Sequence, residues 1–345
     1  MSNKIQLSII VPVYNVAQFL PECLDSLLDQ KEFDYEIVCI DDGSTDDSGS
    51  ILESYKNRFP NRIVTKHLEN CGPSNARNVG LEMARGKYVG FIDSDDVLAC
   101  REVYFEMVEL ANKHQLDIVI GQINRLLNGQ VEPMPKVPAL DNEYAEFYDF
   151  NSLNLLDIPI SACNKIYNRN FLIKHNLWFS RELKSLEGLP FYIDCFLNAK
   201  KISHVDLPIF NYRISDGVEH VSTTSRKNDE FVSSYFSSYI EAITMLHQHN
   251  QYQYDKGIYD KLVSLVDRVL NKTNNTAKVY VEYRSRLLKI IPIRFFLKLS
   301  RKNRVLYSLI WLSPRFEMFS FLYDLVYRSL KRCWHGVTCF FSVRR

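Results

Sequence analysis

Short apolar runs alternate with amphipathic segments along the first third of the chain. The apolar runs have strand length and occupy residues 7–13, 36–40 and 89–92, and residues 63–68 are predicted to form a further strand. Phe19–Leu28 and Ser74–Arg85 lie between them and show helical spacing. Strands that alternate with helices at this spacing predict an α/β fold, with a doubly wound, mostly parallel sheet and helices on both faces.

The pattern continues with a helix at Arg101–His114 and a further strand at Asp117–Asn124. Leu127–Leu140 contains Pro and Gly and is predicted to be a loop. It would divide residues 1–225 into a donor half, 1–125, and an acceptor half, 126–225. Ile202–Arg213 is interpreted as two strands, separated by a turn at Asp206-Leu207-Pro208.

From residue 226 to residue 345 the pattern becomes helical, and the charge changes with it. The whole chain carries 42 Lys and Arg against 41 Asp and Glu. Residues 284–345 hold 14 of those basic residues and two acids, so this tail carries +12 and the rest −11. Its basic residues are interleaved with Phe, Tyr, Trp and Leu, which favours a peripheral helix on an anionic membrane surface over a packed helical cap with a basic outer face. Nucleic acid is disfavoured because no recognised binding motif accompanies the charge.

Composition predicts a folded intracellular protein. Hydrophobic residues make up 46% of the 345 positions, enough for a large core. The eight cysteines form no C-x-x-C pair and are interpreted as buried, reduced thiols. Neither a secretory leader nor an apolar run of about 18 residues is present. We therefore expect a cytoplasmic protein that lies peripherally on the inner face of the plasma membrane.

Carboxylates cluster where two predicted strands end. Asp93, Asp95 and Asp96 follow the 89–92 run, and Asp41 and Asp42 follow the 36–40 run. Ligands bind at the carboxyl ends of strands in open α/β sheets, and oxygen-only sites suit Mg²⁺ or Mn²⁺. A divalent cation is the favoured reading, against a solvated acidic turn or a helix cap. No G-x-G-x-x-G and no P-loop sequence is present, which disfavours a dehydrogenase and a P-loop enzyme.

Four linked motifs then give a specific resemblance. They are Val11-Pro12-Val13-Tyr14-Asn15, Asp41-Asp42-Gly43-Ser44-Thr45-Asp46, Asn70-x-Gly72 with Ala76-Arg77-Asn78-x-Gly80, and Asp93-Ser94-Asp95-Asp96. Their order and spacing resemble the N-terminal half of family 2 glycosyltransferases. The resemblance implies the GT-A fold, which binds nucleotide sugars.

The resemblance also implies roles for the donor-side residues. Pro12 and Tyr14 would lie at the donor, with Tyr14 stacked on the nucleobase unless it is only a rim aromatic. Asp42 would accept a hydrogen bond from an imide N–H, which favours uracil. Arg77 would contact the base or the phosphates, its alternative being a cation on a helix surface. Arg213 would lie on the phosphate side.

The remaining roles concern the metal. Asp95 would bind the cation that bridges the donor diphosphate, which makes it part of the catalytic machinery. Asp93 would reach the ribose or a metal-bound water. His220 is a possible metal ligand or diphosphate clamp, although a lone loop histidine is more often only exposed. Asp41, Asp46 and Asp96 are expected to cap helices or to be solvated.

The general base is the point at which the sequence departs from the family. The family has Glu-Asp where this chain has Glu187-Gly188, and the Asp is taken as the base that deprotonates the acceptor. Glu187 is the preferred substitute and Asp194 the second candidate. Lys165, in the family-like segment N-K-I-Y, is interpreted as a phosphate or acceptor contact, or equally as a surface lysine.

The sequence thus predicts a metal-dependent, inverting glycosyltransferase. It would move a sugar from a UDP-sugar to a saccharide acceptor, in particular a lipid-linked one, in surface polysaccharide synthesis. A catalytically silent paralogue that binds a nucleotide sugar and supports a partner transferase is the alternative, motivated by Gly188. A nucleotidyltransferase is disfavoured because the glycine-rich phosphate loop is absent after residues 7–13.

Overall fold

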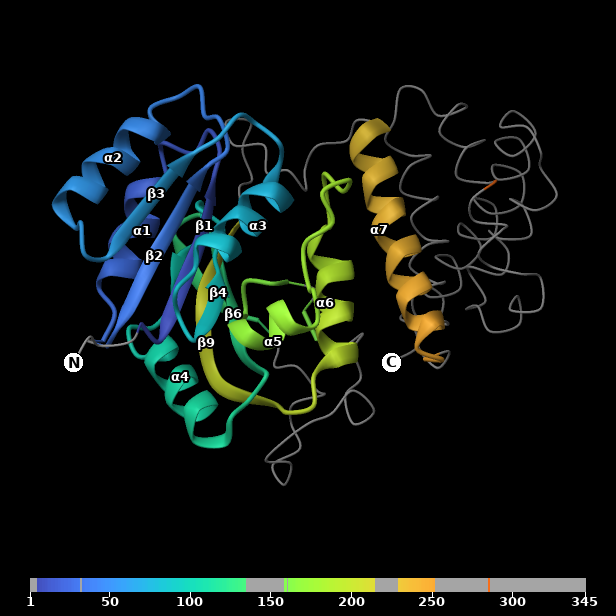
Figure 1. Cartoon of the computed structure of the whole chain (residues 1–345). Coiled ribbons are helices and arrows are strands. Elements are labelled where there is room, and N and C mark those ends of the chain that lie inside the picture. Colours follow the sequence, from blue (N-terminus) through green and yellow to red (C-terminus); the bar gives the residue numbers. More distant parts are fainter. Residues whose placement is uncertain are drawn as a thin grey trace, which may run out of the picture. The chain divides into compact units, whose positions relative to one another are not determined.

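The structure is a computed structural model of the whole chain, and it describes residues 5–31, 33–134, 158–159, 161–214, 229–251 and 285. The chain separates into two compact units, Met1–Ser225 and Arg226–Arg345. The first unit holds the sheet and every described candidate site residue (Figure 1).

The first unit is built on one nine-stranded sheet with the order β3-β2-β1-β4-β8-β6-β9-β5, and β7 pairs with β6 beside this path. The strands are β1 Leu7–Val13, β2 Tyr35–Asp41, β3 Ile63–His67, β4 Tyr88–Phe91, β5 Val97–Leu98, β6 Ile118–Leu127, β7 Gln130–Pro133, β8 Lys165–Asn168 and β9 Ile202–Ile214. β1, β2 and β4 are buried along nearly their whole length, as continuous apolar runs in a covered parallel sheet should be.

Helices cover the sheet. In the first unit they are α1 Leu20–Leu28, α2 Ser48–Arg58, α3 Pro73–Met83, α4 Val103–His114, α5 Arg169–Lys174 and α6 Gly188–Asn198. Consecutive parallel strands are joined by right-handed crossovers, so α1 and α2 lie on one face and α3, on the return crossover from β3 to β4, lies on the other. The predicted doubly wound class is confirmed.

The sheet is mixed, with its parallel part at one end. β3, β2, β1 and β4 are mutually parallel, whereas β8 runs antiparallel to both β4 and β6. The strand order reverses at β1, where β2 lies on one side and β4 on the other. The carboxyl ends of these strands therefore meet at a topological switch point, which is where α/β proteins bind ligands in a crevice between the strand ends.

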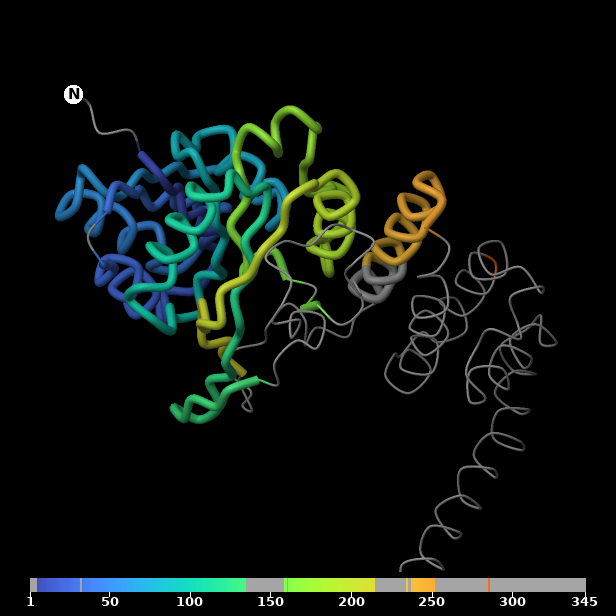
Figure 2. Tube along the Cα trace, turned by 90° about the horizontal axis from the view of Figure 1, so that it is seen from below, coloured from blue at the N-terminus to red at the C-terminus, as the bar shows by residue number. Residues whose placement is uncertain are grey.

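Two predicted elements were wrong. Residues 202–214 form one strand, β9, which pairs with β6 along its length (Figure 2). The register shifts by two residues between His204 and Pro208, so the expected turn at Asp206-Leu207-Pro208 is a bulge. Gly121 permits it, because a Cβ there would lie 2.5 Å from Ile209 Cγ1. The expected loop after Leu127 begins as a hairpin, with β7 paired to β6.

The cysteine prediction holds in part. Cys23, Cys39, Cys163 and Cys195 are buried free thiols, but Cys71 is exposed and Cys100 is half-buried. Cys333 and Cys339 lie outside the described residues.

In the second unit the structure describes α7, Asp229–Gln248, in agreement with the helical pattern expected there. The basic tail at 284–345, except residue 285, lies outside the described residues, so its membrane role stays a prediction. Among the helices that the structure describes, none is both long and apolar enough to cross a bilayer.

Close packing of α3 on β1 depends on a glycine. A Cβ at Gly80 would lie 2.4 Å from Cγ2 and 3.2 Å from Cγ1 of Ile10, which is fully buried. α3 carries Arg77 one turn earlier, so this contact fixes the depth at which that side chain enters the site.

We expect Gly80→Ala to lower the free energy of unfolding by about 1–3 kcal/mol through overpacking, although alanine favours an isolated helix by about 1 kcal/mol. Chemical denaturation measures the loss. Ile10→Ala should rescue part of it in the double variant, and Glu82→Ala on the exposed face of the same helix is the control. A Gly80→Ala variant as stable as the Glu82→Ala control would contradict this packing.

Candidate functional site

The loops that follow β1 and β2 are joined by reciprocal hydrogen bonds. Asn15 adopts a left-handed conformation with φ 50°, its N–H donates to Ser44 Oγ at 3.1 Å, and its Oδ1 accepts from Thr45 N at 2.7 Å. Asn is among the few residues that tolerate this backbone region. The two loops are therefore held together as one wall of the crevice.

The same wall is extended by two further contacts. Asp46 Oδ2 accepts from Ala17 N at 3.0 Å, and Ser48 Oγ accepts from Val16 N at 2.9 Å. Asp46 was expected to cap a helix or to be solvated. Its Oδ1 accepts from Ser48 N, the first backbone N–H of α2, at 3.0 Å, as a helix cap does. The acidic and hydroxyl residues of the second motif thus organise the loops.

Asp42 holds the loop that precedes α3. Its side chain is buried, and its two oxygens accept from Cys71 N at 2.9 Å and Gly72 N at 2.8 Å. Burial raises the pKa of Asp42, and these two N–H groups oppose the rise. The expected acceptor of a base imide is therefore already engaged, and in this structure Asp42 shapes the donor side by fixing residues 71 and 72.

Asp41 begins a chain of polar contacts that leads away from the crevice. Its Oδ1 accepts from Ser44 N at 2.9 Å and its Oδ2 contacts His67 Nδ1 at 2.8 Å, while His67 Nε2 contacts Glu53 Oε1 at 3.0 Å. Hydrogen bonds to Asp41 and Glu53 raise the pKa of His67. The imidazole is favoured as a cation between two carboxylates, and it ties the end of β3 to both β2 and α2.

Arg77 is the centre of the site. Its guanidinium donates through one terminal nitrogen to Asp93 Oδ1 and through the other to Glu187 Oε1, both at 2.6 Å. The Arg77 side chain is 8% exposed, Glu187 15% and Asp93 40%. Asp93 follows β4, and Glu187 immediately precedes α6, so one buried cation joins two elements that lie 94 residues apart in the sequence.

The surroundings of Arg77 keep it charged. Burial acts against the cation, but Asp93 and Glu187 outweigh it and raise the pKa of Arg77 above its ordinary value. The guanidinium also lies over the ring of Phe179, 5.5 Å from its centroid. Arg77 was expected to contact the base or phosphates, or to be a surface cation; here its two terminal nitrogens are engaged by carboxylates.

Three carboxyl groups are crowded in the turn after β4, at Asp93, Asp95 and Asp96. Burial, followed by Asp95 and Asp93, raises the pKa of Asp96 well above its usual range. Burial also raises the pKa of Asp93, with Arg77 opposing and Asp95 reinforcing the rise. Asp96 was expected to be solvated or capping, but it is 1% exposed and its Oδ1 accepts from Arg213 N at 2.9 Å.

Arg213 anchors the end of β9 to this acidic turn. Its Nε donates to the carbonyl of Asp95 at 2.7 Å, and one terminal nitrogen donates to Glu22 Oε2 at 2.7 Å. The guanidinium also packs over the ring of Phe19, 4.8 Å from its centroid. In this structure Arg213 holds the Asp95 turn in position, and its expected place on the phosphate side of the donor stays a prediction.

The remaining predicted residues are distributed as follows. Tyr14 is 43% exposed at the end of β1, and Pro12 is half-buried in the last part of that strand. Asp95 is half-buried between Asp93 and Asp96. Asp194 lies on α6 and accepts from Asn198 Nδ2 at 3.0 Å, seven residues beyond Glu187. His220 lies outside the described residues.

Lys165 was misplaced by sequence reasoning. It is fully buried, and its ammonium donates to Ser161 O at 2.7 Å, Pro159 O at 3.1 Å and Asn164 Oδ1 at 2.6 Å. Burial lowers the pKa of Lys165 to about 7. The lysine is therefore neither a surface residue nor exposed to a ligand. Ala162 and Cys163 before the N-K-I-Y segment, and Ile166 and Tyr167 within it, were the available signal that it enters the core.

A divalent cation fits the acidic turn only together with a donor. Within the described ranges, no three His, Cys, Asp or Glu side chains are grouped to hold a metal ion. Asp93 and Asp95 nevertheless offer hard oxygen ligands beside each other, and Mg²⁺ is commonly held by one or two carboxylates together with substrate phosphates. Asp96 Oδ2 is buried without a hydrogen-bond partner, and the raised pKa of Asp96 favours its neutral form, so Asp93 and Asp95 are the carboxylates of this turn that could face a cation.

We expect Arg77→Met to cost about 2–3 kcal/mol of unfolding free energy, because two partly buried carboxylates lose their common cation. Adding Glu187→Gln should restore part of this loss, since one uncompensated charge disappears. Denaturant unfolding of the double-mutant cycle measures the coupling. Arg181→Met, at an exposed arginine, is the control and should change stability by less than about 0.5 kcal/mol. Additive effects of Arg77→Met and Glu187→Gln would argue against the bridge.

The histidine contacts predict a pH dependence. A raised folded-state pKa means that the stabilisation by His67 is complete below about pH 6.5 and is lost as the pH rises through the folded value. His67→Gln should therefore cost more stability at about pH 5.5 than at about pH 8.5. Lys66→Gln, an exposed neighbour on β3, is the control. Thermal unfolding at both pH values measures the stability that the variant loses. An equal loss of stability at the two pH values would refute the pairing of a charged His67 with Asp41 and Glu53.

Comparison with known proteins shows which sequences and folds this chain resembles. Residues 8–175 match the sequence profile of glycosyl transferase family 2. The chain is 33% identical over 225 residues to the poly(ribitol-phosphate) beta-glucosyltransferase of Bacillus spizizenii, covering 63% of this chain and 33% of that protein. It is 30% identical over 226 residues to the poly(ribitol-phosphate) beta-N-acetylglucosaminyltransferase TarS of Staphylococcus aureus, covering 65% of this chain and 38% of TarS. The chain therefore spans little more than a third of the length of these two relatives.

Solved structures show the same fold. The crystal structure of S. aureus TarS 1-349 in complex with UDP-GlcNAc superimposes with a TM-score of 0.68 at 23% identity, covering 94% of this chain and 92% of that one. The mannosyltransferase PcManGT from Pyrobaculum calidifontis, in complex with GDP-Man and Mn2+, gives a TM-score of 0.51 at 15% identity, covering 94% of this chain and 87% of that one. The profile match identifies residues 8–175 as a domain of glycosyl transferase family 2, and the structural similarities show that the chain has the GT-A fold.

Proposed function

We propose that the chain is an inverting glycosyltransferase that moves a sugar from a UDP-sugar to a saccharide or polyol acceptor. The observation that carries the proposal is the Arg77 bridge. It brings a carboxylate at the end of β4 and a carboxylate at the start of α6 to the same guanidinium, each at 2.6 Å. An inverting transfer needs a base within hydrogen-bond reach of the acceptor hydroxyl, on the side of the sugar opposite the leaving diphosphate, and the bridge holds Glu187 close to the donor-side acid.

The donor would occupy the wall formed by the loops after β1 and β2. Tyr14, the exposed aromatic at this edge, is suited to stack on a nucleobase. Asp42 fixes the neighbouring backbone at Cys71 and Gly72, which leaves backbone groups of this loop to border the base. TarS, whose structures contain UDP and UDP-GlcNAc, supports a uridine donor.

Asp93 and Asp95 would hold a divalent cation together with the donor diphosphate. When bound, such a cation offsets the charge that develops on the leaving diphosphate. Arg213 would contribute by holding the backbone of Asp95, because its Nε donates to that carbonyl at 2.7 Å. The Mn²⁺ in the PcManGT structure supports this assignment.

Glu187 would act as the general base. Its carboxylate would accept the proton of the acceptor hydroxyl while that oxygen forms a bond to the anomeric carbon and the bond from this carbon to the diphosphate oxygen breaks. The products are the glycosylated acceptor, UDP and protonated Glu187, which returns its proton to water. Arg77 holds Glu187 Oε1, which orients the carboxylate and leaves Oε2 for the acceptor.

The acceptor is proposed to be a polyol-phosphate or saccharide chain. Two relatives are named as poly(ribitol-phosphate) glycosyltransferases, which supports an anionic polymer of this type. Attachment of that polymer to a lipid, and contact of the 284–345 tail with an anionic membrane, remain parts of the proposal that rest on the sequence.

A catalytically silent, donor-binding protein is the second candidate. Its support is specific, because Gly188 occupies the position where the family carries its base and Glu187 is already paired with Arg77. This protein would bind UDP-sugar as tightly as an enzyme but would transfer nothing. Turnover by the unmodified chain separates the two candidates.

We expect Glu187→Gln to lower kcat by about 10²–10⁴-fold, since general-base catalysis is lost while the hydrogen bond to Arg77 can persist. UDP affinity in the presence of Mn²⁺, measured by calorimetry, should remain within about twofold of the unmodified value. Glu182→Gln, an exposed acid in the same segment, is the matched control and should retain full activity. A Glu187→Gln variant with unchanged kcat would remove Glu187 from the chemistry.

Asp95→Asn tests the metal assignment separately. We expect it to abolish the dependence of UDP binding on Mn²⁺, because one of two hard carboxylate ligands is lost. Calorimetry with and without Mn²⁺ measures this difference. UDP binding by Asp95→Asn that still rises with Mn²⁺ would exclude Asp95 as a ligand, and failure of the unmodified chain to bind any nucleotide sugar would refute the function as a whole.

A further inference from the structure

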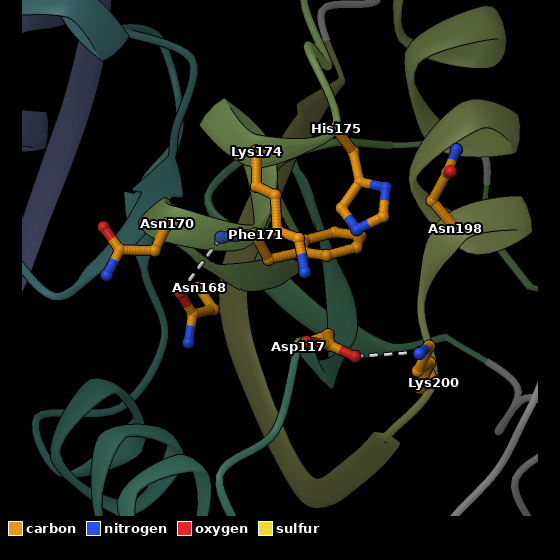
Figure 3. Close-up of a pocket in the computed structure, with 8 residues that line it drawn as sticks. All are labelled: Asp117, Asn168, Asn170, Phe171, Lys174, His175, Asn198 and Lys200. Atoms are coloured by element: carbon orange, nitrogen blue, oxygen red, sulfur yellow. Dashed lines mark hydrogen bonds between the residues drawn. The ribbon is translucent and has the colours of Figure 1, made fainter.

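A pocket separate from the proposed transfer site lies in the first unit, between α5 and the C-terminal end of α6 (Figure 3). Its volume is about 270 Å³, slightly below the range of small-molecule sites, so it suits a single sugar, polyol or phosphate-sized group. Side chains of Lys174, His175 and Asn198 face this opening.

The pocket is far from the Arg77 bridge. α6 begins beside Glu187 and ends at Asn198, and 11 residues of α-helix span roughly 16 Å at about 1.5 Å per residue. Asn168, on the pocket wall, pairs with Tyr88 at the amino end of β4, whereas Asp93 follows the carboxyl end of that strand. The pocket and the proposed transfer site therefore lie at opposite ends of both elements.

Cations dominate the charge of the pocket. Lys174 and Lys200 are exposed, and neither ammonium group makes an ion pair within the described part of the chain. The one carboxylate in the lining, Asp117, already accepts from the backbone N–H groups of Lys200 at 2.8 Å and Lys201 at 3.1 Å through Oδ2. An anionic group would thus meet two free cations and a carboxylate whose charge is partly offset.

The rest of the lining suits hydroxyl groups and a carbon skeleton. Asn168 and Asn170 supply amides from the start of α5, and Asn198 keeps its carbonyl oxygen available because its nitrogen donates to Asp194. The half-buried ring of His175 lies with its centroid 5.2 Å from that of Phe171, which is 6% exposed, so the two rings give the lining an apolar edge rather than an open ring face. A few placed polar groups in a partly apolar lining are typical of a small-molecule site.

We propose that this pocket is an acceptor subsite, which binds a phosphate-bearing polyol or sugar unit of the acceptor chain at a distance from the unit that is glycosylated. The proposal rests on the proposed function, because it assigns the same acceptor a second point of contact. Two contacts on one polymer raise its effective concentration at the transfer site without any new contact there.

A nucleic acid offers the same phosphodiester charge, but this lining disfavours it. Single-stranded nucleic acids are held by exposed aromatic side chains on which bases stack. Phe171 is 6% exposed, so it can border a ligand but cannot present a ring face to a base. The saccharide class is therefore the one that the pocket favours.

Binding is tested first without any activity. Ribitol 5-phosphate, ribitol and inorganic phosphate are titrated against the full chain by isothermal titration calorimetry, with UDP and Mn²⁺ present to occupy the donor site. Ribitol 5-phosphate should bind more tightly than ribitol, and Lys174→Gln with Lys200→Gln should weaken it about tenfold, the equivalent of about 1.4 kcal/mol. Lys113→Gln, an exposed lysine on α4, is the control and should leave the affinity unchanged.

Any one of four binding results would overturn the subsite. The first three are equal binding of ribitol and its phosphate, a double Lys→Gln variant that binds as the unmodified chain does, and tighter binding of a single-stranded oligonucleotide than of a ribitol phosphate oligomer. Equal affinity for inorganic phosphate and ribitol 5-phosphate would also overturn it, because the amide and ring groups would then contribute nothing.

Transfer kinetics then separate this proposal from the proposed function. The Lys174→Gln, Lys200→Gln double variant should raise KM about tenfold for a polymeric acceptor and leave KM for a one-unit acceptor and kcat unchanged. If the double variant has the same KM for the polymeric acceptor as the unmodified chain, the subsite is overturned and the proposed function is not affected. Absence of UDP binding and of transfer by the unmodified chain would instead overturn the proposed function, while the binding experiment would still judge the pocket.

Discussion

The buried guanidinium of Arg77, shared between Asp93 and Glu187, is the interaction on which the site depends. A cation at this depth is stable only with compensating charge, and each carboxylate supplies part of it. The consequence is mechanical as well as electrostatic. If the end of β4 and the start of α6 moved apart, the buried guanidinium would lose a carboxylate partner without gaining water. The donor-side acid and the proposed base are therefore held close together.

The loops around this bridge are organised by the same polar residues that make the motifs recognisable. Asn15, Asp42 and Asp46 each use side-chain oxygens to satisfy backbone N–H groups of a neighbouring loop. Buried backbone donors need such partners. The motifs therefore act as much on the shape of the crevice as on any ligand, and a carboxylate in a motif is not by itself a free ligand for a substrate.

Much of the fold could be predicted from the sequence. Continuous apolar runs such as Leu7–Val13 fix both the strand and its burial, and the carboxyl ends of parallel strands fix where Asp41 and Asp93 emerge. The bulge of β9 could not be predicted, because Asp206-Leu207-Pro208 has the composition of a turn and only the fit of Gly121 against Ile209 shows otherwise. The burial of Lys165 could not be predicted for a similar reason, because the carbonyl groups that it bonds lie in a loop whose sequence has no periodic pattern.

The partners of Arg77 were the least predictable feature of the site. Sequence spacing placed Arg77 and Asp93 at the crevice, but Glu187 lies 110 residues beyond Arg77, and no local pattern pairs them. A crystal structure of the chain with a UDP-sugar and Mn²⁺ tests the central claim most directly. The account predicts the diphosphate beside Asp93 and Asp95, with Glu187 still bonded to Arg77 and facing the anomeric carbon opposite the diphosphate. A donor bound away from this acidic turn, or Glu187 pointing away from the sugar, would contradict it.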